Sequence, residues 1–106
     1  MTKTYDKLVR DRIPEIIEGT GQRCEIRVLS DEDCIRKLDE KLNEELAEYQ
    51  ESKAIEELAD LLEVIEATAR MRGCSWETLL DIKEQKRQKR GGFDKKLLLL
   101  EVSDQL

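Results

Sequence analysis

Two consecutive stretches of the chain repeat apolar residues at steps of three and four, and this spacing constrains the fold more than any other feature. The first carries Ile35, Leu38, Leu42, Leu46 and Tyr49, and the second carries Ile55, Leu58, Leu62, Ile65 and Ala69. Such steps place side chains on one face of a helix. We therefore expect two long antiparallel helices, from Ser30 to about Gln50 and from about Lys53 to Arg72.

Proline, serine and glycine mark the ends of two further helices. Pro14 is tolerated only in a first turn, so a short helix should begin near Arg12 and stop at residues 19–21. Ser75 is a good N-cap for a helix from Trp76 to about Arg90, which Gly91 and Gly92 end. Residues 24–29 alternate apolar and polar side chains, which predicts a short strand pairing with residues 96–101. The predicted fold is mostly α: one domain, residues 1–106, forming an antiparallel helical bundle with a two-stranded β element.

The second long helix carries more apolar surface than one neighbour can cover. Besides its main stripe it has a second face with Leu61, Val64, Thr68 and Met71, and the chain of 106 residues has only four aromatic residues. A single copy would leave one face exposed, and large exposed apolar patches usually mark interfaces. We therefore expect a homodimer or homotetramer in which oligomerisation completes a four-helix core.

Four carboxylates lie beside these apolar stripes rather than opposite them. Glu45 and Glu48 border the first stripe, and Glu57 and Asp60 begin the second face of the next helix. Carboxylates about 5 Å apart repel by about 3 kcal/mol at an effective dielectric of 20, so such a cluster needs a cation or protonated members. All-oxygen ligation suits Mg²⁺ or Mn²⁺. In a chain with 25 acidic residues, the alternative is a helical interaction module whose acids are merely solvated.

Composition excludes several other classes. The chain has no histidine, and its three cysteines are far apart, which argues against a zinc cluster. The net charge of −6 argues against a nucleic-acid polymer as the main partner. Neither a membrane-spanning apolar run nor a signal peptide is recognisable, so we expect no membrane partner and a cytoplasmic location.

The acidic residues occur in a pattern that resembles a known family. Glu44-Glu45-Leu-Ala-Glu48, followed by Glu57-Leu-Ala-Asp60, resembles the E-E-x-x-E…E-x-x-D signature of the all-α nucleotide pyrophosphohydrolases. Three further segments, KLVRDRIPEII, ELADLLEVI and KRQKRGGF, resemble the MazG-like branch often labelled phosphoribosyl-ATP pyrophosphohydrolase-like, and together they span nearly the whole chain. Only eight residues separate Glu48 from Glu57, fewer than is usual in that family.

The resemblance implies Mg²⁺-dependent hydrolysis of a nucleoside triphosphate to a monophosphate and pyrophosphate, in the clearance of non-standard or surplus nucleotides. The implied metal ligands are Glu45, Glu48, Glu57 and Asp60. With no histidine, a carboxylate or a metal-bound hydroxide has to activate water, and Glu44 and Glu48 are both candidates. Two basic segments would bind the phosphates of the substrate. Their phosphate-binding residues would be Lys7, Arg10, Arg12, Lys86, Lys89 and Arg90. Hydrolysis of phosphoribosyl-ATP in histidine biosynthesis is the alternative with the same chemistry.

Overall fold

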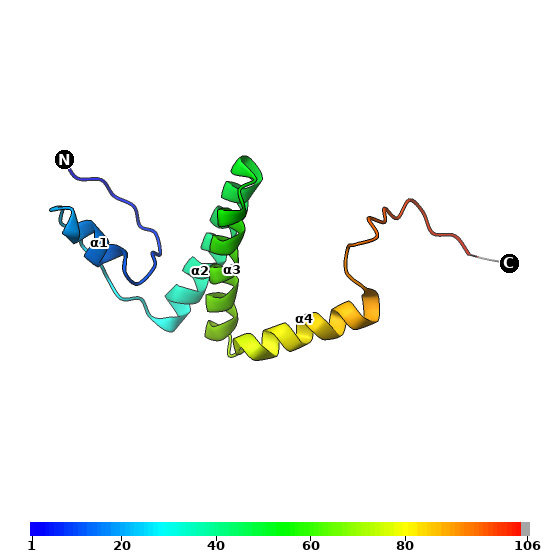
Figure 1. Cartoon of the computed structure of the whole chain (residues 1–106). Coiled ribbons are helices and arrows are strands. Elements are labelled where there is room, and N and C mark those ends of the chain that lie inside the picture. Colours follow the sequence, from blue (N-terminus) through cyan, green and yellow to red (C-terminus); the bar gives the residue numbers. More distant parts are fainter. Residues whose placement is uncertain (105–106) are drawn as a thin grey trace.

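The computed structural model describes residues 1–104 and contains four helices (Figure 1). In chain order these are α1 (Ile13–Gly19), α2 (Asp31–Ser52), α3 (Ile55–Met71) and α4 (Trp76–Arg90). Each begins and ends within a few residues of the position that the sequence predicts. The mostly α fold is thereby confirmed.

The helix ends have local causes. The Ser30 Oγ accepts a hydrogen bond from the Asp33 N–H at 3.2 Å and caps α2, and the Ser75 Oγ accepts one from the Thr78 N–H at 3.1 Å and caps α4. Helix α2 ends at Lys53, which adopts a left-handed backbone with φ 58° and donates its N–H to the Tyr49 carbonyl. This tight ending turns the chain directly into α3.

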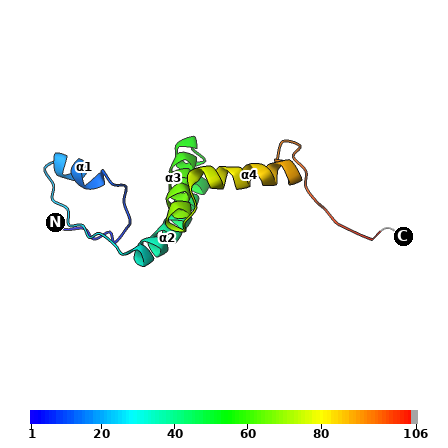
Figure 2. The same ribbon diagram turned by 90° about the horizontal axis from the view of Figure 1, so that it is seen from below.

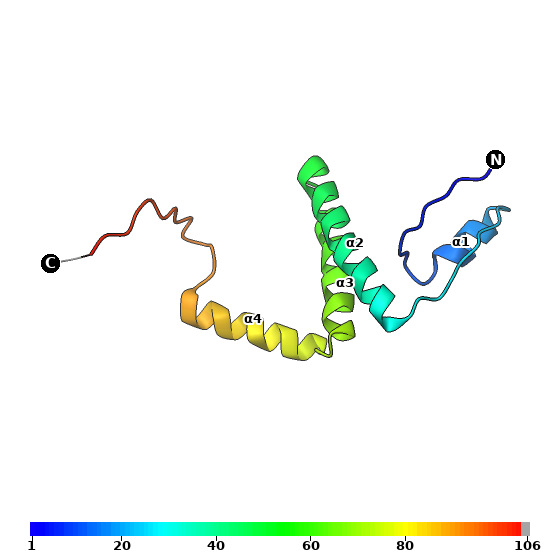
Figure 3. The ribbon, with the colours of Figure 1, turned by 180° about the vertical axis from the view of Figure 1, so that it is seen from behind.

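Helices α2 and α3 form an antiparallel hairpin, visible side by side in Figures 1 and 3. Leu38 of α2 and Val64 of α3 are the buried apolar residues of the part that the structure describes. The face of α3 that carries Val64 therefore packs on α2. The first part of the main stripe stays open to solvent, with Ile55, Leu58 and Leu62 exposed by 73%, 40% and 50%, whereas Ile65 and Ala69 are half-buried.

The other elements project away from the hairpin, as the perpendicular view in Figure 2 shows. The radius of gyration is 19.2 Å, whereas a compact chain of 100 residues has about 13 Å. Along its three principal axes the protein measures 71 × 31 × 21 Å. A single copy therefore has a helical hairpin but no compact core.

The predicted β element is wrong. Residues 24–29 and 96–101 both lie in irregular backbone, and no strand occurs within residues 1–104. The two segments lie on opposite sides of the hairpin (Figure 1), so neither offers the other the partner that a strand requires. The leucines at positions 97–100 are instead exposed. In the same described part of the chain, no helix has the length and apolar character needed to cross a bilayer.

Candidate metal centre

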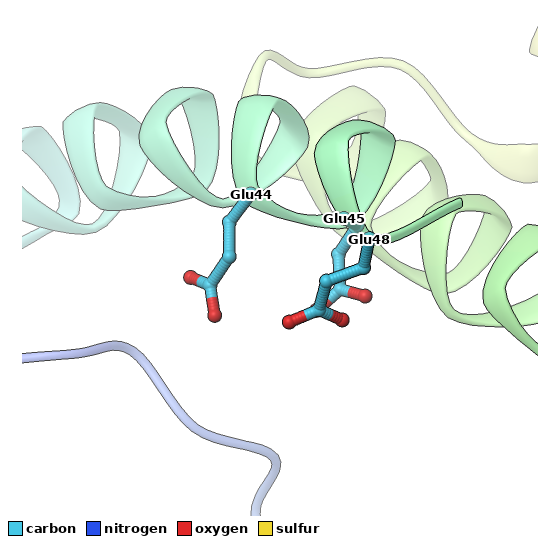
Figure 4. Close-up of side chains that lie close together, drawn as sticks. All are labelled: Glu44, Glu45 and Glu48. Carbon is cyan, nitrogen blue, oxygen red and sulfur yellow. The ribbon is translucent and has the colours of Figure 1, made fainter. Parts of the chain in front are cut away.

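The predicted acids come together at the turn end of the hairpin. Three of them, Glu44, Glu45 and Glu48, lie on α2 with carboxylate oxygens within 4.8 Å of one another (Figure 4). A second group joins Glu45 to Glu57 and Asp60 of α3 within the same distance. Glu45 thus belongs to both groups. The short turn after Ser52 is what brings the beginning of α3 beside the last turns of α2.

Glu45 is the one buried charged residue of the described chain, at 7% exposure. Its Oε1 lies 3.6 Å from Lys41 Nζ, but its Oε2 has no hydrogen-bond partner within residues 1–104. A buried carboxylate oxygen without a partner is unfavourable, and native structures rarely keep one unless an ion or water satisfies it. The acids around it supply only oxygen donors, which is the donor set that Mg²⁺ and Mn²⁺ prefer. The residues therefore fit a divalent cation.

Burial and mutual repulsion alter the acidity of this cluster. Burial raises the pKa of Glu45 above its ordinary value of 4.5, and the negative charge of Glu48 raises this pKa further. The same two causes raise the pKa of Glu57. Both carboxyls therefore hold protons to a higher pH than surface carboxyls do. A bound divalent cation would counter the part of these pKa shifts that arises from repulsion between the carboxylates.

Two of the predicted basic residues reach the cluster within the same chain. Lys7 Nζ lies 3.1 Å from Glu44 Oε1, and Arg10 Nη2 lies 2.8 Å from Asp60 Oδ1. The hydrogen bond to Glu44 raises the pKa of Lys7. The N-terminal segment therefore supplies counter-charge to both helices of the hairpin.

The other predicted phosphate-binding residues lie elsewhere in this copy. Arg12 pairs with Glu15 at 3.4 Å at the start of α1. Lys86, Lys89 and Arg90 lie in the last part of α4, which starts at the opposite end of α3 from the acids and leads away from the hairpin (Figure 1). Because Asp60, the last acid of the cluster, precedes Met71 at the end of α3 by 11 residues, about 17 Å of helix separates that end from the cluster. Within one chain, these three side chains do not reach the acids.

Lys41 is a member of the site that the sequence analysis missed. Its Nζ lies 3.8 Å from Glu44 Oε2 and 3.6 Å from Glu45 Oε1, and its side chain is only 18% exposed. The signal was present, because residues three and four positions apart are neighbours on a helix surface. Lys41 offsets part of the negative charge, but Glu45 Oε2 still has no hydrogen-bond partner in the described part of the chain.

Comparison with known proteins leaves the chain without an assigned family. No protein-family model matches it, and no solved structure matches it. A stretch of 42 residues, 40% of the chain, is 55% identical to a protein of Mycolicibacterium smegmatis described as uncharacterized. The match covers 43% of that relative, so the chain spans less than half of its length. The functional argument therefore rests on the geometry of the site and on the sequence motifs.

Proposed function

We propose that the protein is a divalent-metal-dependent nucleotide pyrophosphohydrolase, which cleaves nucleoside triphosphates between the α and β phosphates. The observation that carries the proposal is the buried Oε2 of Glu45, which lies between two groups of carboxylates and has no hydrogen-bond partner among residues 1–104. A solvated acidic face has no reason to bury such an oxygen. The motif resemblance supplies the reaction class.

Four side chains would hold the metal: Glu45, Glu48, Glu57 and Asp60. When bound, Mg²⁺ or Mn²⁺ would polarise the phosphate oxygens and favour ionisation of water. In the reaction, the water oxygen bonds to the α phosphorus while the bond to the oxygen bridging to the β phosphorus breaks. The products are a nucleoside monophosphate and pyrophosphate.

Glu44 and Glu48 are the two candidates to accept the proton of the attacking water. Glu44 is engaged by Lys7 and Lys41, whereas Glu48 is exposed and forms no ion pair within residues 1–104. Comparing Glu44→Gln with Glu48→Gln distinguishes them. Because Glu48 is also a proposed ligand, Glu48→Gln should weaken Mn²⁺ binding as well as turnover. Loss of turnover at unchanged Mn²⁺ affinity in Glu44→Gln would identify Glu44 as the proton acceptor, and wild-type turnover in Glu44→Gln would leave Glu48 in that role.

The proposed active unit contains at least two copies, as a homodimer or homotetramer. The exposed stripe of Ile55, Leu58 and Leu62 has no partner within the described chain, and a second copy of the hairpin would cover it. The same arrangement would let Lys86, Lys89 and Arg90 of one copy reach the acids of another. We assign this role to a second copy of the chain because one chain forms only half of a four-helix core.

The decisive experiment is a product analysis over a broad panel of canonical and modified NTPs and dNTPs, with phosphoribosyl-ATP included. We expect a monophosphate and pyrophosphate with Mg²⁺, and no turnover with EDTA. Orthophosphate and a diphosphate as primary products would contradict the cleavage position. Turnover of phosphoribosyl-ATP and of no other substrate in the panel would instead assign the protein to histidine biosynthesis. No turnover on any substrate would favour the helical interaction module.

A further inference from the structure

The N-terminal segment, residues 1–12, contacts the acidic cluster from outside the hairpin. Lys7 reaches Glu44 on α2 and Arg10 reaches Asp60 on α3, at 3.1 and 2.8 Å. In Figure 4 the carboxylates of α2 point toward this segment. One short stretch of chain thus contacts both helices that supply the proposed metal ligands.

These two ion pairs can be broken at a small cost in free energy. The Lys7 and Arg10 side chains are 54% and 56% exposed, and ion pairs open to water contribute little to stability. Among residues 1–12 only Leu8 is even half-buried. The segment is therefore attached to the hairpin mainly by these two cations.

The charges of the two side chains that contact the acids match the charge of the expected ion. Lys7 and Arg10 together carry two positive charges, which is the charge of one divalent cation. A divalent cation on Asp60 would repel the guanidinium that Asp60 now binds, because like charges this close repel strongly. Lys41 differs, since it belongs to α2 itself and is half-buried.

We propose that Lys7 and Arg10 occupy the acidic cluster while it is free of metal, leave it when a divalent cation binds, and then bind the phosphates of the substrate. The inference rests on the proposed function and gives the order of binding, in which the metal binds first and the polyphosphate second. Released side chains stay close because the segment remains joined to α1, which keeps their effective concentration high. Binding of metal and of polyphosphate is then coupled, and the coupling acts equally in both directions.

The first test measures Mn²⁺ affinity by electron paramagnetic resonance, which counts free Mn²⁺ in a titration of the full chain. Without the two competing cations, K7Q/R10Q should bind Mn²⁺ about threefold or more tightly than the wild type, given two surface ion pairs. K3Q is the matched control. Lys3 lies in the same segment and carries the same charge, but its Nζ faces the Tyr5 ring at 5.1 Å rather than the acids. It should leave the affinity unchanged.

The second test follows tryptic cleavage after Lys7, which requires the Lys7 side chain to be free of Glu44. Mn²⁺ alone should accelerate this cleavage in the wild type, and subsequent addition of inorganic tripolyphosphate should slow it again. Tripolyphosphate should also tighten Mn²⁺ binding in the wild type more than in K7Q/R10Q. These readouts do not require turnover.

The outcomes separate this inference from the proposed function. If Mn²⁺ binds and D60N weakens it, but K7Q/R10Q and K3Q behave alike and Mn²⁺ does not change the rate of cleavage after Lys7, the metal site stands and the inference is overturned. If neither the wild type nor K7Q/R10Q binds Mn²⁺, the metal site itself is wrong and both proposals are overturned.

Discussion

Arg10 donates a hydrogen bond to Asp60 at 2.8 Å although 50 positions separate the two residues in the chain. The first belongs to an irregular segment before α1, and the second lies in the early part of α3 beside buried Glu45. The contact connects a basic N-terminal motif to a proposed metal ligand. It gives the acidic cluster a counter-charge that no local helix pattern would supply.

Removing a proposed ligand should abolish activity. We expect Glu57→Gln or Asp60→Asn to lower kcat by about a hundredfold or more, because each removes charge that holds the metal against the phosphates. Neither change should destabilise the metal-free fold, since each removes one member of a repelling cluster. The measurements are steady-state kinetics and thermal melting.

Glu63→Gln is the matched control for these variants. Glu63 lies on the same helix, is exposed and belongs to neither group of carboxylates. It should retain wild-type kinetics. Equal damage from Glu63→Gln would show that the acids were assigned to the wrong faces of α3.

Metal should stabilise the fold through the same residues. Millimolar Mg²⁺ should raise the melting temperature of the wild type, and EDTA should reverse the increase, because a ligand that binds only the folded state stabilises it. The increase should be absent in Asp60→Asn and present in Glu63→Gln. An equally small shift in all three proteins is what a merely solvated acidic face would give.

The raised pKa values of Glu45 and Glu57 predict how the stability of the metal-free protein depends on pH. A carboxyl whose pKa is higher in the folded state than in the unfolded state binds more protons when folded, so its contribution to stability is present at acid pH. That contribution is lost as pH rises from the ordinary value of 4.5 through the raised value. Glu45→Gln should therefore be more stable than the wild type at pH 7, measured with EDTA.

The difference between Glu45→Gln and the wild type should shrink toward pH 4.5, where the wild-type carboxyl is protonated as well. Mg²⁺ should reverse the order at pH 7, because the variant lacks a ligand. A stability difference independent of pH would show that the substitution acts through the packing of the side chain and not through the charge of Glu45.

Assembly should be obligatory. The melting temperature should rise with protein concentration, because dissociation accompanies unfolding. Leu58→Gln with Leu62→Gln should dissociate the oligomer, since both side chains lie on the exposed stripe of α3. Light scattering would contradict the expectation if the wild type had a mass near 12.4 kDa, that of one chain, and a melt independent of concentration.

Much of the secondary structure was predictable because its causes are local. Ser30 and Ser75 cap helices through bonds to residues three positions later, and Gly91 with φ 82° ends α4 where the sequence suggests. The edge positions of Glu45 and Glu48 also follow from helical spacing. The strand predicted over residues 24–29 is absent from the structure, because alternation is a local pattern whereas a strand is stable only with a partner from elsewhere in the chain.

The remaining features depended on which surfaces meet in space. The sequence shows two apolar faces on the second long helix, but only packing against α2 decided that Val64 is buried while Leu58 and Leu62 are exposed. The same packing buried Glu45 and left its Oε2 with no hydrogen-bond partner within the residues that the structure describes. Periodicity specifies which side chains share a face of a helix. Burial and the pairing of Arg10 with Asp60 depend on contacts between residues far apart in the chain, and local spacing carries no information about them.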